Sequence, residues 1–301
     1  MNRQKLDIPN GLSRNYQSLR VQVCHPCNTV RFSQLETRVA MLLRSSDPYT
    51  DSWSAGTEDI ALWLAKIIWL LARKASVSLD PLHPNGVNRD TIIPQELLAN
   101  LEIAKVMIHL HAHEHSLLAC REKDPPFPEF FYGAPYSLYR FKVRPQSEED
   151  HFDFTDNYLG QLAAVRSGNL GIICIFDGGL HASYLSDQYA DYVGPELHPI
   201  QWREIIGRII CDQTVIEPEL FGVQHYYWNK KINSAVAALK CPRFISPYNR
   251  ENVDDDLFVE VLRRQTGQQI EKFSDGPQTR FGTFLRTQDG KVRDFFQETD
   301  V

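Results

Sequence analysis

Apolar residues in the first third of the chain recur with the period of a helix. This pattern predicts a helix over 33–44. Residues 57–74 are apolar on nearly every side and include Trp63 and Trp69, so we expect this helix to be enclosed by partners. The segment 95–121 contains neither glycine nor proline, which predicts a third helix. The N-terminal part is therefore expected to form a helical bundle.

Two local signals mark boundaries in the chain. Ser33 and Glu36 have the spacing of a capping box, in which the serine is the N-cap and the glutamate reaches back to it. The proline-rich run at 125–128 interrupts any regular element. We therefore expect a helical domain over 1–124 and a mixed α+β domain over 125–301.

The pattern changes in the second part of the chain. Residues 136–144 alternate between apolar and polar, and residues 170–176 are continuously apolar, so both segments are predicted to be strands. Further elements are predicted as helices over 156–166, 182–193, 199–212 and 218–240, a helix capped by Asp254 that stops before Gly267, and a hairpin of 281–287 with 292–296 around Asp289-Gly290. Helix exceeds strand and there is no β-α-β alternation. We predict a helix-dominated α+β fold, with the N-terminal helical part packed on a smaller mixed part that has few strands.

Composition and charge narrow the choice of partners. The chain has 301 residues, a formal net charge of −6 and a pI of about 5.9. Proteins on duplex DNA usually need a basic face, so duplex DNA is not expected as a partner. The most apolar segment, 60–72, contains Lys66 and is shorter than the about 20 residues of a bilayer span, so no membrane association is expected. The N-terminus lacks the apolar region of a secretory signal, and most of the six cysteines stand alone, which together indicate a cytoplasmic protein.

A histidine cluster, His109–His115, is the first candidate for chemistry. His111 and His115 lie one turn apart on a helix, and Cys24 and Cys27 could complete a set of four zinc ligands. The favoured interpretation is that the histidines are core or interface residues and the cysteines an inert thiol pair, with no metal or other cofactor. The alternatives are a structural metal site and a catalytic one, and the latter would make the protein a hydrolase-like, metal-dependent enzyme.

A basic strand is the second candidate. Alternation places Arg140, Lys142 and Arg144 on one face of the predicted strand, with Tyr139 on the other. Three cations within about 14 Å repel one another unless an anion lies near them. The acidic run at 148–150 could supply that charge, and so could a phosphate, which arginine binds in a bidentate manner. Nearby aromatic residues suit a nucleotide base. A solvated strand face without ligand is the alternative.

The Arg-x-x-x-Arg spacing of Arg140 and Arg144 resembles the arginine motif of the PilZ family of cyclic-di-GMP receptors. The resemblance covers five residues, since the companion Asp/Asn-x-Ser-x-x-Gly motif of that family is absent from the chain. It implies that two arginines at this spacing can bracket a cyclic dinucleotide.

A glycine turn after the second predicted strand is the third candidate. Asp177, Gly178 and Gly179 precede His181 at the start of a predicted helix. Backbone N–H groups at such a position can bind an anion, and the histidine adds a donor. No nucleotide-binding glycine motif is present, so a turn without ligand is the alternative.

These observations lead to one functional hypothesis and one alternative. The hypothesis is a non-enzymatic, ligand-responsive regulatory or adaptor protein that binds an anionic small molecule, such as a nucleotide or cyclic dinucleotide, through the basic strand. Arg140 and Arg144 are expected to contribute equally to binding and Lys142 less, because lysine lacks the planar fork of arginine. A protein partner is a further expectation. The alternative is the metal-dependent enzyme that uses His109–His115.

Overall fold

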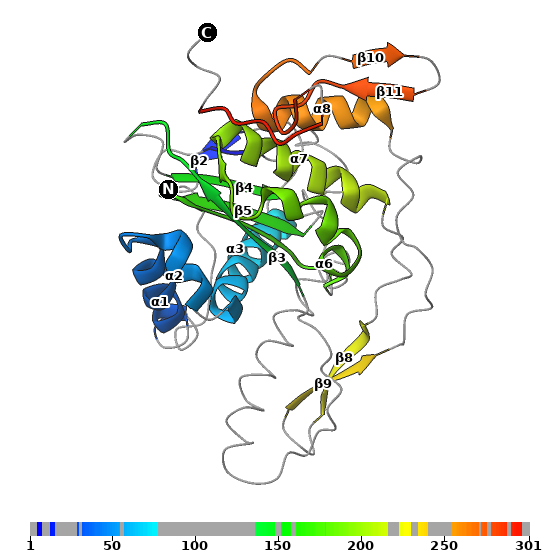
Figure 1. Ribbon diagram of the computed structural model, residues 1–301. Coiled ribbons are helices and arrows are strands. Elements are labelled where there is room, and N and C mark those ends of the chain that lie inside the picture. Colours follow the sequence, from blue (N-terminus) through cyan, green and yellow to red (C-terminus); the bar gives the residue numbers. More distant parts are fainter. Residues whose placement is uncertain are drawn as a thin grey trace.

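The computed structural model has an α+β fold in which N-terminal helices precede a five-stranded sheet with further helices (Figure 1). The predicted fold class is therefore confirmed. The structure describes residues 5–7, 13–15, 29, 32–54, 57–77, 136–147, 152–157, 161–177, 179–215, 223–229, 234–239, 254–270, 272–275, 278–287 and 290–296.

The central sheet has the strand order β4-β5-β6-β3-β7. All neighbouring strands are antiparallel except β3 and β7, which are parallel. Every residue of β6 is buried, because both faces of the sheet are covered, and a strand in this position is apolar throughout rather than alternating. The strands are β3 (Ser137–Val143), β4 (Phe152–Asn157), β5 (Leu162–Ser167), β6 (Leu170–Ile175) and β7 (Glu196–Leu197).

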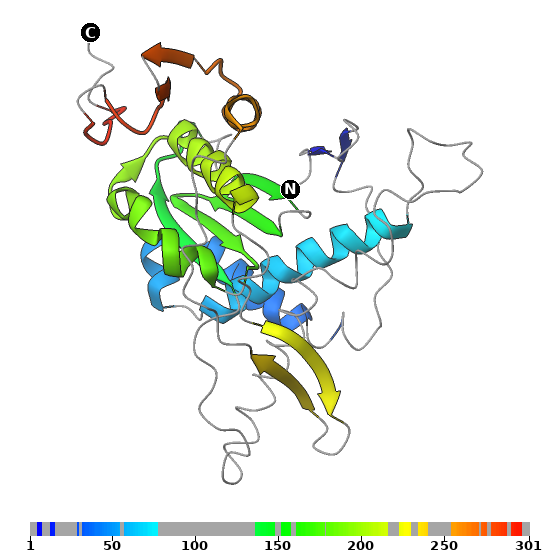
Figure 2. The ribbon, with the colours of Figure 1, turned by 90° about the vertical axis from the view of Figure 1, so that its right-hand side faces the viewer.

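Three N-terminal helices cover one face of this sheet. They are α1 (Ser33–Leu43), α2 (Pro48–Ser54) and α3 (Thr57–Val77). Figure 2 shows α3 on one side of the sheet and α7 on the other. Side chains of α1 and α3 share a core with Leu170, Ile172 and Cys174 of β6. Trp63 is buried and Trp69 is partly buried, as their all-round apolar surroundings predict.

The opposite face is covered by α6 (Leu180–Leu185) and α7 (Pro199–Val215), with two 3-10 turns between them, η4 (Ser186–Gln188) and η5 (Ala190–Tyr192). Trp202 of α7 packs directly over Gly171 of β6, where a Cβ atom would lie 2.6 Å from the indole nitrogen. Glycine at this position therefore allows the helix to approach the sheet closely. Helix α8 (Asp255–Thr266) packs on α7.

Three two-stranded hairpins complete the described elements. They are β1 (Lys5–Asp7) with β2 (Ser13–Asn15), β8 (Val223–Asn229) with β9 (Ser234–Leu239), and β10 (Lys272–Asp275) with β11 (Gln278–Phe281). Among the residues that the structure describes, no helix combines the length and the apolar character needed to cross a bilayer.

Two predicted helices are wrong. The segment 156–166 forms the end of β4 and most of β5, because its alanines and Val165 are buried between two covering layers and pair with β6. The segment 218–240 contains the β8–β9 hairpin, whose first strand is rich in aromatic residues that favour strands. The helix predicted over 182–193 is shorter, since α6 ends at Leu185 and only 3-10 turns follow.

The predictions for both ends of α8 are confirmed. The Asp254 side chain accepts hydrogen bonds from the backbone nitrogens of Asp256 and Leu257 and so caps α8. Gly267 ends this helix in the left-handed conformation, with a φ of 69°. Near the C-terminus, the predicted hairpin is reduced to a tight turn at Gly290 and one bridge between Arg286 and Val292.

The predicted capping box at Ser33 and Glu36 is wrong. The N-cap position is Phe32, and no side chain caps the helix there. Glu36 instead forms an ion pair with Lys66, a buried residue in the middle of α3. This pair neutralises the charge of Lys66 within the apolar segment 60–72, and it links α1 to α3. The domain division at residue 125 and the helix predicted over 95–121 lie outside the described residues and stay predictions.

Candidate functional site

Strand β3 presents the two faces that its alternating sequence predicts. Tyr139, Phe141 and Val143 are buried in the core that the sheet shares with α7. Arg140 and Lys142 are only partly buried and lie on the side of the N-terminal helices. The strand therefore carries a core face and a basic face. We use the name basic face for Arg140, Lys142 and Arg144 throughout.

Two members of the basic face have a counter-charge within the protein. Glu196 of β7 lies opposite Lys142 in the parallel pair. Its Oε2 is 2.5 Å from Arg144 Nη2, and its Oε1 is 3.6 Å from Lys142 Nζ. The Arg144 guanidinium also lies over the ring of Phe296, 4.1 Å from its centroid, and its side chain is 52% exposed. The predicted source of negative charge, 148–150, lies outside the described residues.

Arg140 has a different environment. Its Nη2 donates a 2.7 Å hydrogen bond to Thr57 Oγ1, at the start of α3. The guanidinium lies over the ring of Trp53, 4.9 Å from its centroid. Its Nε is buried and has no hydrogen-bond partner within the described part of the chain. Burial lowers the pKa of Arg140, although the nearby tyrosines 136 and 49 oppose this effect. Among the described residues, no carboxylate forms an ion pair with Arg140.

Aromatic residues surround the Arg140 end of the basic face. Trp53 is 56% exposed, which is unusual for a side chain of this size. Tyr49 meets it edge to face, with ring centroids 6.2 Å apart. The backbone nitrogen of Tyr49 donates to Asn169 Oδ1, which fixes α2 against the β5–β6 turn. An exposed aromatic surface is thus held beside a partly buried cation.

The remaining predicted site residues form a separate group on the core side of the sheet. Asp177 accepts hydrogen bonds from the backbone nitrogens of Gly179 and His181, at 2.9 and 2.7 Å, and from the hydroxyl of Ser137. Burial raises the pKa of the Asp177 carboxyl, and these hydrogen bonds oppose the shift. The N–H groups expected to bind an external anion are therefore occupied by a carboxylate of the protein. Gly178 lies outside the described residues.

His181 is fully buried within this group. Its Nδ1 shares a 2.7 Å hydrogen bond with the hydroxyl of Tyr139, and its Nε2 is 3.4 Å from Asp212 Oδ2. Tyr189 also donates to Asp212, at 2.6 Å. Burial raises the pKa of Tyr139 above its usual value, so that its hydroxyl stays protonated. This buried network links α6, α7 and β3. It holds the elements of the core in place and lies on the opposite face of β3 from Arg140.

Seven of the eight predicted binding residues are described, and they fall into two groups. The basic face consists of Arg140, Lys142 and Arg144, whereas the group on the core side of the sheet contains Tyr139, Asp177, Gly179 and His181. The sequence reasoning missed Trp53, Thr57 and Glu196. Glu196 gave no local signal, because its place beside Arg144 depends on the pairing of β7 with β3.

The predicted metal site stays a prediction. Cys24, Cys27 and His109–His115 all lie outside the described residues. Within the described ranges, no group of three or more histidine, cysteine, aspartate or glutamate side chains is arranged to hold a metal ion. Two cysteines, Cys174 and Cys211, are described, and both are buried thiols outside any disulfide bond.

Comparison with known proteins gave no relative for this chain. No family model, curated protein or solved structure matches it.

Proposed function

We propose that this protein is a non-enzymatic, ligand-responsive regulatory or adaptor protein of the cytoplasm, and that it binds a phosphorylated small molecule through its basic face. Nucleotides and cyclic dinucleotides are the first candidates, and a protein partner would receive the signal. The observation that carries the proposal is the environment of Arg140: a partly buried guanidinium that has an unpartnered Nε and no ion pair among the described residues.

A cation in this position is costly for the fold. Removing charge from water is unfavourable unless a partner of opposite charge or a full set of hydrogen bonds compensates. Thr57 supplies one acceptor and Trp53 supplies the face of a ring, but neither carries a negative charge. A phosphate group would provide both charge and several acceptor oxygens. The guanidinium is thus prepared for an anion that the described part of the chain does not supply.

Trp53 supports a nucleotide rather than a simple phosphate. Stacking of a base on an aromatic ring contributes about 1–3 kcal/mol per base and tolerates any base. The indole is 56% exposed and lies against the arginine that would bind the phosphate. A base and a phosphate of one ligand could therefore be bound by neighbouring side chains.

The other two cations have a lesser role in this proposal. Lys142 and Arg144 share Glu196, so their charge is already balanced within the sheet. A ligand at their end of the strand must compete with a carboxylate and with the ring of Phe296. We therefore place the primary contact at Arg140 and revise the equal contribution that the spacing alone suggests.

Calorimetry on the full chain with ATP, GTP, cyclic di-GMP and inorganic phosphate tests the proposal. At least one nucleotide should bind more tightly than phosphate, with heat that decreases as salt is added. The Arg140→Ala variant should lose about 1.5–3 kcal/mol of that binding free energy, as expected for a charge-assisted hydrogen bond. The control is Arg263→Ala, which removes an exposed arginine paired with Glu260 on α8. Absence of any nucleotide binding with a Kd below about 1 mM would reject the proposal.

A further inference from the structure

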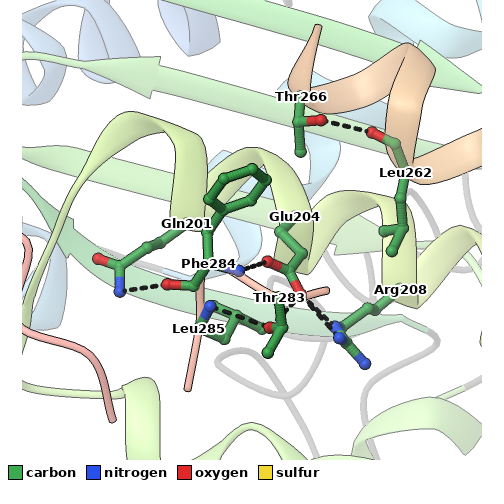
Figure 3. A network of polar contacts seen from close by, with 8 residues as sticks. All are labelled: Gln201, Glu204, Arg208, Leu262, Thr266, Thr283, Phe284 and Leu285. Carbon is green, nitrogen blue, oxygen red and sulfur yellow. Dashed lines mark hydrogen bonds and ion pairs between the residues drawn. The ribbon is translucent and has the colours of Figure 1, made fainter. Parts of the chain in front are cut away.

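Residues 283–287 and 290–296 lie across the N-terminal half of α7, and we call these residues the strap. Figure 3 shows Gln201, Glu204 and Arg208 of α7 directed toward the first limb of the strap, which contains Thr283, Phe284 and Leu285. The second limb begins at Gly290 and returns antiparallel to the first, with one bridge between Arg286 and Val292. The strap thus ends near the basic face.

Glu204 fixes the first limb. Its carboxylate has no exposed surface and accepts hydrogen bonds from Thr283 Oγ1 and from the backbone nitrogen of Phe284, both at 2.6 Å. Arg208, one turn further along α7, balances its charge at 2.7 Å. A buried carboxylate with all of these partners is difficult to separate from them, because the charge would be left unpaired. Leu285 adds an apolar anchor in the core beneath α7.

Gln201 fixes both limbs at once. Its amide nitrogen donates to the carbonyl oxygen of Phe284 at 3.0 Å and to that of Arg293 at 2.9 Å. Its amide oxygen accepts a hydrogen bond from the backbone nitrogen of His198 at 2.8 Å, so both the donor and the acceptor of this buried amide have partners. The backbone nitrogen of Arg293 also donates to the carbonyl oxygen of Leu285. The base of the strap, up to Arg293, is therefore part of the folded core.

The last three described residues are held differently. We call Asp294, Phe295 and Phe296 the tip. Phe295 stacks on His198 with ring centroids 4.9 Å apart, and Phe296 lies over Arg144. The backbone nitrogen of Phe296 donates only to Asp294 Oδ1, within the tip itself. Among the described residues, no hydrogen bond joins the tip to the sheet or to α7. Within the described part of the chain, only ring contacts hold the tip in place.

We propose that the tip is a displaceable cover on the Arg144 end of the basic face, and that a bound nucleotide takes its place. The identity of the ligand in this inference rests on the proposed function. The opening of the tip independently of the base does not depend on that function. The tip offers Arg144 a planar ring, which is the kind of surface that a nucleotide base also offers, and the phosphate of the same ligand would pair with the guanidinium. The base of the strap remains in place when the tip leaves, because Glu204 and Gln201 hold only the residues before it.

Hydrogen exchange of the free protein tests the separation of tip and base. Amides of Asp294–Phe296 should exchange on the order of a hundredfold faster than those of Phe284 and Arg293, since local opening without global unfolding leaves the base protected. Equal exchange rates in the two parts would overturn the proposal, whether or not any ligand binds.

Titration with ATP, followed by calorimetry, tests the competition. Phe296→Ala should bind ATP roughly two- to fivefold more tightly than the wild type, the factor that corresponds to one cation–π contact at an exposed site. Adding Arg144→Ala should remove this gain. The control is Leu257→Ala, which shortens an exposed apolar side chain on α8 and should leave affinity unchanged.

The possible results separate the two claims. A gain in ATP affinity in Phe296→Ala that disappears when Arg144→Ala is added supports the proposal that the tip is a displaceable cover. Wild-type binding of ATP that Phe296→Ala does not alter overturns it. Failure of both proteins to bind any nucleotide rejects the proposed function and with it the competition, while the exchange experiment still decides whether the tip opens on its own.

Discussion

Arg140 lies within β3 and Arg144 directly follows the last residue of this strand, yet these two arginines, four residues apart, have different surroundings. Arg144 has a carboxylate partner in Glu196 and an aromatic cover in Phe296, and half of its side chain reaches solvent. Arg140 is more enclosed, and its guanidinium has only a hydroxyl and an indole as described partners. The comparison shows that the charge of Arg144 is balanced within the fold, whereas Arg140 has no ion pair among the described residues, and for this reason we propose Arg140 as the primary contact for a ligand.

Reversing the charge at each position should give the largest difference. Arg140→Glu places a carboxylate where the phosphate is proposed to bind, so nucleotide affinity should fall by at least about a hundredfold, since close like charges cost several kcal/mol. Arg144→Glu should reduce affinity by only about threefold, because that end is already neutralised by Glu196. Calorimetry with the same nucleotide on both variants measures the difference. Equal losses would show that the two arginines act as one site.

Removing Glu196 should make the Arg144 end resemble the Arg140 end. In Glu196→Gln, Lys142 and Arg144 lose their counter-charge, and the added positive potential should strengthen nucleotide binding by roughly three- to tenfold at low salt. The gain should shrink at high salt, where the Debye length falls to about 3 Å. Glu260→Gln on α8 makes the same change in net charge far from the basic face and serves as the control. Unchanged affinity in Glu196→Gln would show that this end of the face takes no part in binding.

The free energy of unfolding, measured without ligand, should respond differently to substitution of Arg140 and of Arg144. Arg140→Met removes a partly buried cation and keeps the length of the side chain, so urea unfolding should show a gain of about 0.5–1.5 kcal/mol. Arg144→Met leaves Glu196 without its closest partner and should be neutral or destabilising by up to about 1 kcal/mol. Destabilisation by Arg140→Met would mean that the fold itself, and not a ligand, retains this arginine.

Lys142 should give the smallest effect of the three. It lies between the arginines, but its ammonium is 3.6 Å from Glu196 and is partly exposed. Lys142→Ala should change nucleotide affinity by less than about twofold and stability by less than about 0.5 kcal/mol, as is usual for an exposed ion pair. A loss comparable to that of Arg140→Ala would move the centre of the site toward the middle of the strand.

Much of the local structure follows from short patterns in the sequence. The alternation around Arg140 predicts the two faces of β3, and Asp254 with Gly267 predicts both ends of α8. Failures occur where local preference is ambiguous. The composition of the segment 156–166 is compatible with a helix, and its pairing with β6 is what makes it a strand.

In the candidate site too, some features follow from local sequence patterns and others depend on contacts between distant segments. Alternation within one strand finds the basic face, because that requires no knowledge of the rest of the chain. The unequal roles of Arg140 and Arg144 depend on Trp53 and Glu196, which reach the strand from α2 and from β7. Similarly, the turn at Asp177 is located by its glycines, but the use of its N–H groups by the Asp177 carboxylate is visible only in three dimensions.

The buried thiols of Cys174 and Cys211 can report how fast the layers around them open. Burial raises the pKa of Cys211 to about 12 and that of Cys174 well above its usual value, so at neutral pH almost no reactive thiolate is present in the folded state. Alkylating reagents can modify these positions only after the surrounding layers separate. Because Cys174 lies between the sheet and the N-terminal helices, and Cys211 between α7 and α8, their rates of alkylation would time the opening of two different interfaces in one experiment.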